Sequence, residues 1–355
     1  MVYFGLANVL FLLRYALARA QNARRQFYYI VLWGLFIFSA FRFQVGCDWS
    51  GYYHQFIVAQ NIEWSSFTEM REPIWWAILG GIQAIGLPYP VVNIAASAMF
   101  FIGVHVLAQR QPDPLGFLVL LFPILIINLP MSGIRQGAAI GILCIAFTAF
   151  IDRRATVYAL WIIIGAGFHS SALIFLLLVP LATGRYTKPR LILAALLSIP
   201  GLFILISGES GEIASSRYIG TGTEAYGAIF RVGILALSAL YFFFFVRKKW
   251  VRSFPQDYSL VSLGALGMAL TIFIAPVSSV IADRFGYYLV PLQTMIFARI
   301  PYLPLRYNNG LHSALPYLGL LFVFGVWTQL SGHFQQCYIP YKSWILGLPS
   351  DGLLY

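Results

Sequence analysis

Residues 27–53 read FYYIVLWGLFIFSAFRFQVGCDWSGYY, an apolar run that ends abruptly in polar and charged residues. With its flanks, the apolar part covers most of a membrane-spanning helix, which needs about 20 such residues. Arg42 follows at once, and Asp48 comes six residues later. Ionisable groups at membrane depth are costly and mark functional sites. This stretch therefore predicts a membrane protein with a polar site beside its second span.

Isolated charged or imidazole groups recur at the edges of three later apolar segments. They occur in GIRQGAA (133–139), GFHSSA (167–172) and ADRFGYY (282–288). Each group would be expensive to keep at membrane depth without a partner or a ligand. Together with residues 42–53, these segments predict one shared polar cavity.

The composition of the whole chain is that of a membrane protein. Of 355 residues, 60% are hydrophobic and 10% charged, and the mean hydropathy is +0.78. A soluble domain is about a quarter charged. The opening MVYFGLANVLFLL has no basic n-region or small-residue cleavage site, so we expect a retained first helix. We predict one all-α transmembrane domain over residues 1–355, with roughly 10–13 membrane helices that include short or re-entrant segments.

The net charge of +11 reflects orientation in the membrane and not nucleic-acid binding. The basic residues crowd into short loops between apolar runs, which the positive-inside rule places in the cytoplasm. By the same alternation, loops 42–72 and 207–228 and the tail 331–355 lie outside. The basic residues of the inner loops are Arg19, Arg24, Arg25, Arg110, Arg153, Arg154, Arg185, Lys188, Arg190, Arg247, Lys248, Lys249, Arg252, Arg299 and Arg306.

Two apolar segments do not fit a simple alternation of spans. Residues 73–87 either cross the membrane or dip in and return outside. The second arrangement obeys the positive-inside rule, because it places Arg110 inside and Arg135 outside, and we favour it. Residues 156–183 have basic loops at both ends yet are short for two spans. We expect a bent hairpin with His169 near its outer turn.

Cysteine and histidine spacing indicates no metal site. Cys144 lies in an apolar run, where packing explains it. Cys47 and Cys337 both fall outside, where disulfides form. The sequence leaves open whether they meet. No Cys/His pattern is typical of zinc, and we expect neither a metal nor a cofactor.

Three arginines predict a site for pyrophosphate. Arg42, Arg135 and Arg284 each stand apart from other basic groups. Guanidinium donors match phosphate oxygens bidentately and stay charged when buried. A phosphate at membrane depth indicates a polyprenyl lipid carrier. For Arg42, the alternative is that the side chain only reaches to the interface.

A hydroxyl group that reacts at such a site needs a proton acceptor, and two residues are candidates. Asp48 lies near Arg42 in sequence, which makes its carboxylate a weak base but a good orienting group. His169 has serines beside it and few charged neighbours, and an imidazole titrates near neutrality. We favour His169 as base and Asp48 as the orienting residue, with the reverse assignment open.

The ordered motifs FRFQVGCDWSGYYHQF, REPIWW, GIRQGAAIGI with IDRR, FHSSALIFLLLVP and DRFGYYL resemble the EpsG family of polysaccharide polymerases. These belong with the Wzy-type O-antigen and capsule polymerases. The resemblance covers nearly the whole chain. It implies substrate-binding roles for Tyr52, Glu72 and Gln136, although Glu72 before Pro73 also suits a helix start. The matching positions are Arg42, Gly46, Asp48, Tyr52, Glu72, Arg135, Gln136, His169 and Arg284.

The resemblance implies a GT-C-like polymerase architecture and a metal-independent glycosyltransferase. The enzyme would act on the outer face of the bacterial inner membrane. It would transfer the growing chain from undecaprenyl pyrophosphate to the non-reducing end of a new lipid-linked unit. Its partners would be these donor and acceptor lipids, the surrounding membrane lipids and a chain-length regulator.

Two other classes of protein also carry charge within the membrane. A lipid-linked oligosaccharide flippase would have charge through both leaflets, whereas here it crowds one side. A membrane O-acyltransferase would need a histidine that an acyl thioester can reach from inside. We expect His169 to lie outside, which disfavours that class.

Overall fold

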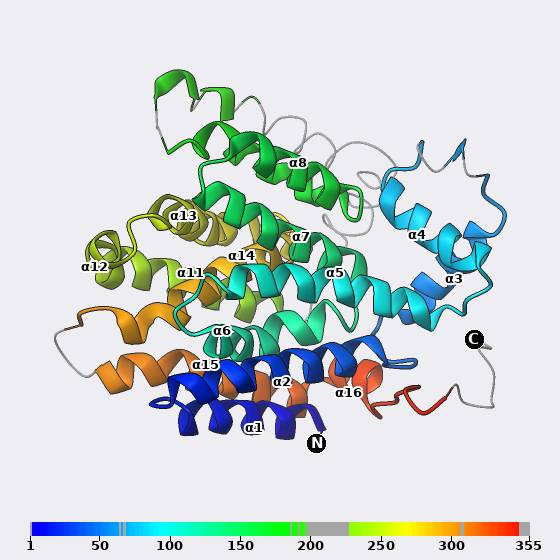
Figure 1. Ribbon diagram of the computed structural model, residues 1–355, viewed down its shortest axis with the longest axis horizontal. Coiled ribbons are helices and arrows are strands. Elements are labelled where there is room, and N and C mark those ends of the chain that lie inside the picture. Colours follow the sequence, from blue (N-terminus) through cyan, green and yellow to red (C-terminus); the bar gives the residue numbers. More distant parts are fainter. Residues whose placement is uncertain are drawn as a thin grey trace.

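The computed structural model describes residues 2–63, 65–66, 69–184, 187–190, 192–194, 196, 227–305 and 309–347. Within these ranges the chain is helical, and apart from one isolated bridge between Arg42 and Ser343 it contains no strand. The longer helices run roughly along one common direction (Figure 1). The all-α prediction is confirmed.

The first half of the described chain supplies the helices that carry most of the predicted site. They are α1 (Val2–Ala16), α2 (Gln21–Ala40), α3 (Trp49–Ala59), α4 (Pro73–Ala84), α5 (Pro90–Ala108), α6 (Pro114–Leu121), the π-helical η2 (Phe122–Ile126), α7 (Ile134–Ile151), α8 (Ala155–Ala166) and the 3₁₀ helix η3 (Ser170–Leu181). The second half supplies α11 (Ala228–Tyr241), η4 (Phe242–Val246), α12 (Arg247–Ser253), α13 (Tyr258–Ile274), α14 (Ser279–Arg299), η5 (Ile300–Tyr302), α15 (Asn309–Leu330) and α16 (Gly332–Tyr338).

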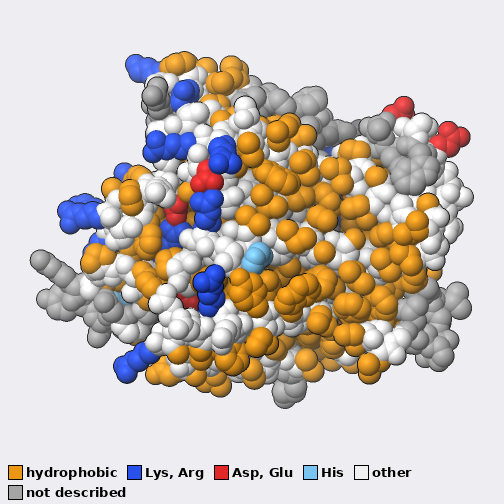
Figure 2. All heavy atoms as spheres, in the orientation of Figure 1, with side chains coloured by type: hydrophobic (Ala, Val, Ile, Leu, Met, Phe, Trp, Pro, Cys, Tyr) orange, Lys and Arg blue, Asp and Glu red, His pale blue; other side chains and the backbone are white. Residues whose placement is uncertain are grey.

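Four described helical stretches are long and apolar enough to cross a membrane: Pro90–Ala108, Ile134–Ile151, Ala228–Ser253 and Gly310–Leu330. Several shorter apolar helices accompany them. Hydrophobic side chains cover a broad part of the visible face, whereas Lys and Arg gather toward its left end (Figure 2). This distribution is that of a polytopic membrane protein with one basic end.

Helix α7 runs through the middle of the bundle and is buried over almost its whole length. It packs backbone to backbone on α5, because both helices have glycine at the contact. A Cβ atom on Gly103 would lie 1.7 Å from the Gly141 carbonyl oxygen, so only glycine fits. Small residues allow this close approach in membrane proteins. The contact fixes α7, whose first turn carries Arg135, against α5.

The two ends of α7 lie at chemically different ends of the bundle. At its C-terminal end, Asp152 pairs with Arg110 at 2.7 Å. The same end holds Asp113, which accepts ion pairs from Arg14 at 3.0 Å and Arg24 at 3.2 Å. We call this the basic end. Arg135 begins the opposite end, so Arg110 and Arg135 are separated as the favoured topology requires.

Helix α4 starts and finishes at the Arg135 end. The backbone N–H of Trp75 donates to the Gly167 carbonyl at 3.0 Å. Near the other end of α4, the Gln83 side chain donates to the Phe56 carbonyl of α3. The chain then reaches Tyr89, whose ring meets Trp49 edge-on at 4.9 Å. Residues 73–87 therefore do not span the bundle. They enter it and return to the same end, which is the arrangement that the sequence favoured.

Helices α8 and η3 form the bent hairpin expected for residues 156–183. Each leg has 12 residues, and the Tyr158 hydroxyl ties them by donating to the Phe175 carbonyl at 2.9 Å. Although the two legs have the same number of residues, the 3₁₀ leg η3 is longer in space, because a 3₁₀ helix rises about 2.0 Å per residue and an α-helix about 1.5 Å. His169 lies in the turn at the Arg135 end.

The C-terminal segment packs on the loop that follows α2. Cys47 and Cys337 form a disulfide, which answers the question that the sequence left open. The Phe43 N–H donates to the Lys342 carbonyl at 3.0 Å, and the Trp344 N–H donates to the Phe41 carbonyl at 3.0 Å. The tail thus clamps the loop that carries Asp48.

Several sequence predictions fall where the structure describes little or nothing. The predicted outer loop 207–228 lies outside the described residues except for its last two. Residues 348–355 of the predicted outer tail, and also Arg185 and Arg306, lie wholly outside the described residues.

Candidate active site

The Glu72 carboxylate joins three segments that are far apart in sequence. Its Oε2 accepts from Arg135 Nη1 at 2.5 Å. Its Oε1 accepts from the Ser170 backbone N–H at 3.0 Å and lies 3.7 Å from His169 Nδ1. Glu72 is only 6% exposed. A buried carboxylate needs such partners, and here they bring the predicted arginine and the predicted base to one place.

His169 is the N-cap residue of η3, with extended backbone dihedrals. Its Nδ1 lies 3.0 Å from Ser171 Oγ, which in turn lies 2.8 Å from the Tyr288 hydroxyl of α14. Within the described chain, the polar contacts of the imidazole all involve Nδ1. The ring is therefore oriented through Nδ1.

Arg135 lies in the first turn of α7 and is held from two sides. Glu72 binds one of its terminal nitrogens, and the guanidinium lies over the Tyr52 ring at 5.5 Å. Tyr52 is itself 7% exposed and meets Trp75 edge-on at 5.5 Å. The Arg135 side chain remains 29% exposed. It is thus anchored yet able to present N–H groups to an anion.

Gln136 connects the site to α14. Its side-chain amide donates to the Arg284 backbone carbonyl at 2.6 Å, and Gln136 is 6% exposed. Arg284 itself is exposed and acts electrostatically on His169. The buried amide therefore positions the turn of α14 from which Arg284 projects.

Asp48 stands beside this group on the other side of the start of α7. Its Oδ2 accepts from Ser132 Oγ at 3.3 Å. Asp48 precedes α3, but its side chain does not cap the helix, and it is exposed. The carboxylate is therefore accessible to solvent, close to the segment that leads into Arg135.

Comparison with protein families identifies the chain. The family model described as the EpsG family matches residues 25–343. The chain belongs to the EpsG family. This is a family of Wzy-type polysaccharide polymerases, so the chain is a polysaccharide polymerase in the general sense. Comparison with curated proteins and with solved structures gave no match, so the GT-C-like architecture stays a prediction.

Arg42 is the one predicted pyrophosphate ligand that the structure keeps away from this EpsG-family site. It is 1% exposed. Its Nε donates to the Val45 carbonyl and its Nη1 to the Ser39 carbonyl, both at 3.0 Å. The guanidinium also faces the Trp49 ring at 5.8 Å. Through these contacts Arg42 stabilises the bend after α2. Its burial argues against contact with a lipid diphosphate.

Two arginines of the EpsG-family site were missed in the sequence. Arg71 donates from Nε to Ser170 Oγ at 3.1 Å. Arg231 of α11 binds Asp283 through Nε at 2.5 Å and Nη2 at 2.9 Å, and it lies over the Tyr287 ring. The signal for Arg231 was its place inside the apolar run 229–246, where an isolated charge marks a site. Arg71 directly precedes Glu72 in the REPIWW motif.

One group of three potential metal ligands comes together in the described chain. It consists of Cys47, His333 and Cys337. Two of the three are joined in the disulfide, so their sulfurs are not free thiolates. Glu72 and Asp48 instead accept from Arg135, from the Ser170 backbone N–H and from Ser132 Oγ.

Proposed function

We propose that this EpsG-family chain polymerises lipid-linked oligosaccharide repeat units at the outer face of the bacterial inner membrane. It transfers the growing chain from undecaprenyl pyrophosphate to the non-reducing end of a second lipid-linked unit. Family membership supports the polymerase class. The observation that carries the proposal is that Glu72 couples Arg135, an arginine suited to pyrophosphate, to His169, a base suited to a hydroxyl.

The proton passes to His169 in this mechanism. The acceptor hydroxyl attacks the anomeric carbon of the donor sugar, a new glycosidic C–O bond forms, and the bond to pyrophosphate breaks. Nε2 takes the hydroxyl proton in the ring tautomer whose own proton lies on Nδ1, where Ser171 Oγ at 3.0 Å and the Glu72 carboxylate can accept it. The Glu72 carboxylate, 3.7 Å from Nδ1, stabilises the imidazolium that results. Ser171 keeps the ring oriented.

The leaving pyrophosphate gains charge as the bond breaks, and Arg135 and Arg284 meet that charge. Preorganised donors aimed at developing charge are a large catalytic term, worth about 10²–10³ in rate for a single donor. Glu72 and Tyr52 hold Arg135 in place, and Gln136 holds the helix that carries Arg284. Tyr52 and Gln136 thus act by positioning arginines.

Asp48 orients the acceptor. It is exposed, and within the described chain its carboxylate accepts a hydrogen bond from the Ser132 hydroxyl. A carboxylate can accept hydrogen bonds from two sugar hydroxyls.

A reconstituted assay tests this function. The protein in proteoliposomes receives one defined undecaprenyl-pyrophosphate-linked repeat unit, and products are resolved by chain length on a gel. We expect a ladder of polymers with release of undecaprenyl pyrophosphate in step with each new linkage. Unextended repeat units at all times, with the protein folded, would refute the proposal. Transport of a fluorescent lipid-linked unit without polymer would instead identify a flippase.

A further inference from the structure

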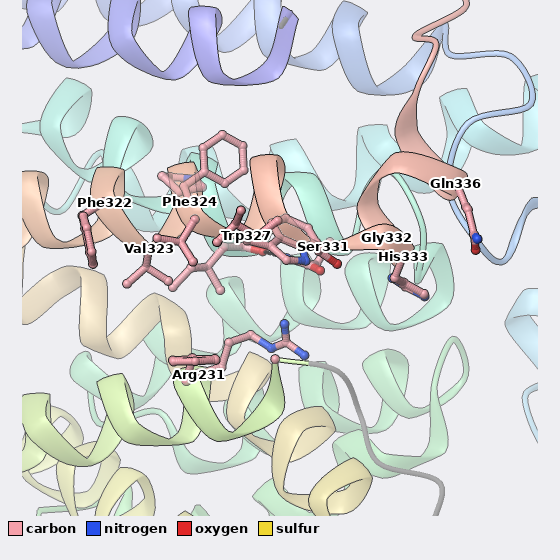
Figure 3. A pocket seen from close by; sticks show the side chains of 16 residues that line it. Arg231, Phe322, Val323, Phe324, Trp327, Ser331, Gly332, His333 and Gln336 are labelled. Carbon is pink, nitrogen blue, oxygen red and sulfur yellow. Dashed lines mark hydrogen bonds between the residues drawn. The ribbon is translucent and has the colours of Figure 1, made fainter.

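Helices α11 and α15 border a groove that the proposed chemistry does not use. It has a volume of about 640 Å³, which is near the middle of the ~300–1,000 Å³ range of ligand pockets. Phe322, Val323 and Phe324 of α15 lie toward one end of the groove in Figure 3, whereas His333 of α16 lies toward the other. Arg231 faces them from α11.

The groove continues along the two helices as a second cavity of about 510 Å³. Phe322 and Val323 line both cavities, so the two meet there. The second cavity is lined almost wholly by apolar and aromatic side chains of α11, η4 and α15, and Phe244 within it is 77% exposed. A long apolar channel between two helices that are apolar enough to span a membrane suits a hydrocarbon chain.

The polar end of the groove adjoins the site through Arg231. Arg231 binds Asp283, the residue before Arg284 on α14. The cation that we assign to the leaving pyrophosphate therefore projects from the same turn of α14 that anchors the groove. An anionic headgroup at Arg231 would lie beside the reaction centre.

A second contact ties the polar end of the groove to the other side of the site. His333 at the start of α16 lines the groove, and its Nε2 lies 3.2 Å from Cys47 Sγ. Cys47 directly precedes Asp48. The mouth of the groove is thus bounded by the segments that carry Arg284 and Asp48.

We propose that this groove binds the polyprenyl chain of the donor lipid, with its diphosphate at the Arg231 end. The inference rests on the proposed function and locates one of its two substrates. The donor is favoured because its diphosphate leaves at the reaction centre. The diphosphate of the acceptor is separated from the reacting hydroxyl by a whole repeat unit. The arginine at the mouth and the apolar length match a polyprenyl diphosphate at its two ends.

Gly319 offers a way to fill the groove without disturbing the fold. It lines the second cavity, and a Cβ atom there would meet nothing within 4 Å. Gly310 on the same helix also has open space around it but does not line the groove. Gly319→Phe therefore tests the site, and Gly310→Phe is the matched control.

The experiment uses a diazirine-bearing undecaprenyl diphosphate and the full chain in proteoliposomes, with crosslinks mapped by mass spectrometry. We expect crosslinks on α11 and α15, reduced about tenfold by Gly319→Phe and unchanged by Gly310→Phe. Unlabelled undecaprenyl diphosphate should compete better than undecaprenol, which lacks the headgroup. Crosslinks elsewhere, an unaffected Gly319→Phe, or equal competition by ordinary phospholipid would overturn the inference.

Polymerisation measured in the same vesicles separates this inference from the function on which it rests. Polymer formed by the wild type without crosslinks in the groove would overturn the groove as the donor site and leave the function standing. Crosslinks in the groove without polymer would overturn the function and uphold the lipid site.

Discussion

Glu72 binds Arg135 through one carboxylate oxygen, at 2.5 Å, and faces His169 and the Ser170 N–H through the other. One buried acid thus serves both the proposed leaving-group site and the proposed base. A substitution at Glu72 should therefore impair both the leaving-group site and the base. A substitution at Arg135 should also alter the position of the Glu72 carboxylate.

The first prediction concerns this coupling. Glu72→Gln keeps the shape but removes the charge that holds Arg135 and stabilises the His169 imidazolium. We expect the polymerisation rate to fall by about 10²–10⁴. The loss in Glu72→Gln/Arg135→Lys should be clearly smaller than the product of the two single losses, because contacting residues are not additive.

Asp152→Asn provides the control for Glu72→Gln. It breaks an acid–arginine pair at the basic end, between Asp152 and Arg110, and should leave the rate unchanged. Fully multiplicative effects of Glu72→Gln and Arg135→Lys would show that the two residues act independently and would contradict the prediction.

The second prediction separates charge from geometry at Arg135. Arg135→Lys keeps a cation but loses the planar fork that matches phosphate and stacks on Tyr52. We expect a rate loss of about 10²–10³ at equal protein level. Arg110 is an exposed arginine at the basic end, and Arg110→Lys should polymerise at the wild-type rate. Wild-type chain lengths from Arg135→Lys would remove this residue from the site.

The third prediction assigns the base. His169→Ala should lower the catalytic rate by about 10²–10⁴ while the lipid-linked donor still binds. Asp48→Asn should weaken the reaction less and mainly raise the acceptor concentration needed for half-maximal rate. Single-turnover assays with separately varied donor and acceptor measure both effects. A more severe loss in Asp48→Asn, or full activity in His169→Ala, would reverse the assignment.

The fourth prediction concerns the clamp between the tail and the Asp48 loop. The Cys47–Cys337 disulfide closes a loop of 290 residues, and loss of a native disulfide costs about 2–5 kcal/mol in small domains. Reduction, or Cys47→Ser, should lower the thermal midpoint in detergent and reduce polymerisation by loosening Asp48. The double variant Cys47→Ser/Cys337→Ser should not respond further to reductant. An unchanged midpoint on full reduction would show that the clamp is dispensable.

The fifth prediction tests orientation by cysteine labelling. Ser50 at the site end and Ser253 at the basic end are both exposed. The native cysteines should react little, because two are joined in the disulfide and Cys144 is buried. An impermeant maleimide should label Ser50→Cys in intact cells and Ser253→Cys only after permeabilisation. The opposite pattern would place the site in the cytoplasm.

The membrane class, the segregation of charge and most of the candidate site follow from the sequence alone. The reason is that the cost of placing a residue in hydrocarbon is local. The run 27–41 became most of α2, and isolated polar groups at the edges of apolar runs identified His169 and Arg135 without any knowledge of the packing. The short return of residues 73–87 was also favoured by charge alone, because Arg110 and Arg135 had to lie at opposite ends.

Tertiary structure alone decided which of these groups lie together. Glu72 and Arg135 are 63 residues apart and Cys47 and Cys337 are 290 apart. The sequence offered Arg42 and Arg135 as equivalent pyrophosphate ligands, yet Arg42 is buried on backbone carbonyls. Hydrogen bonds and ion pairs act over about 3 Å and depend on direction. Their partners are therefore set by how distant helices pack, which no local pattern of residues encodes.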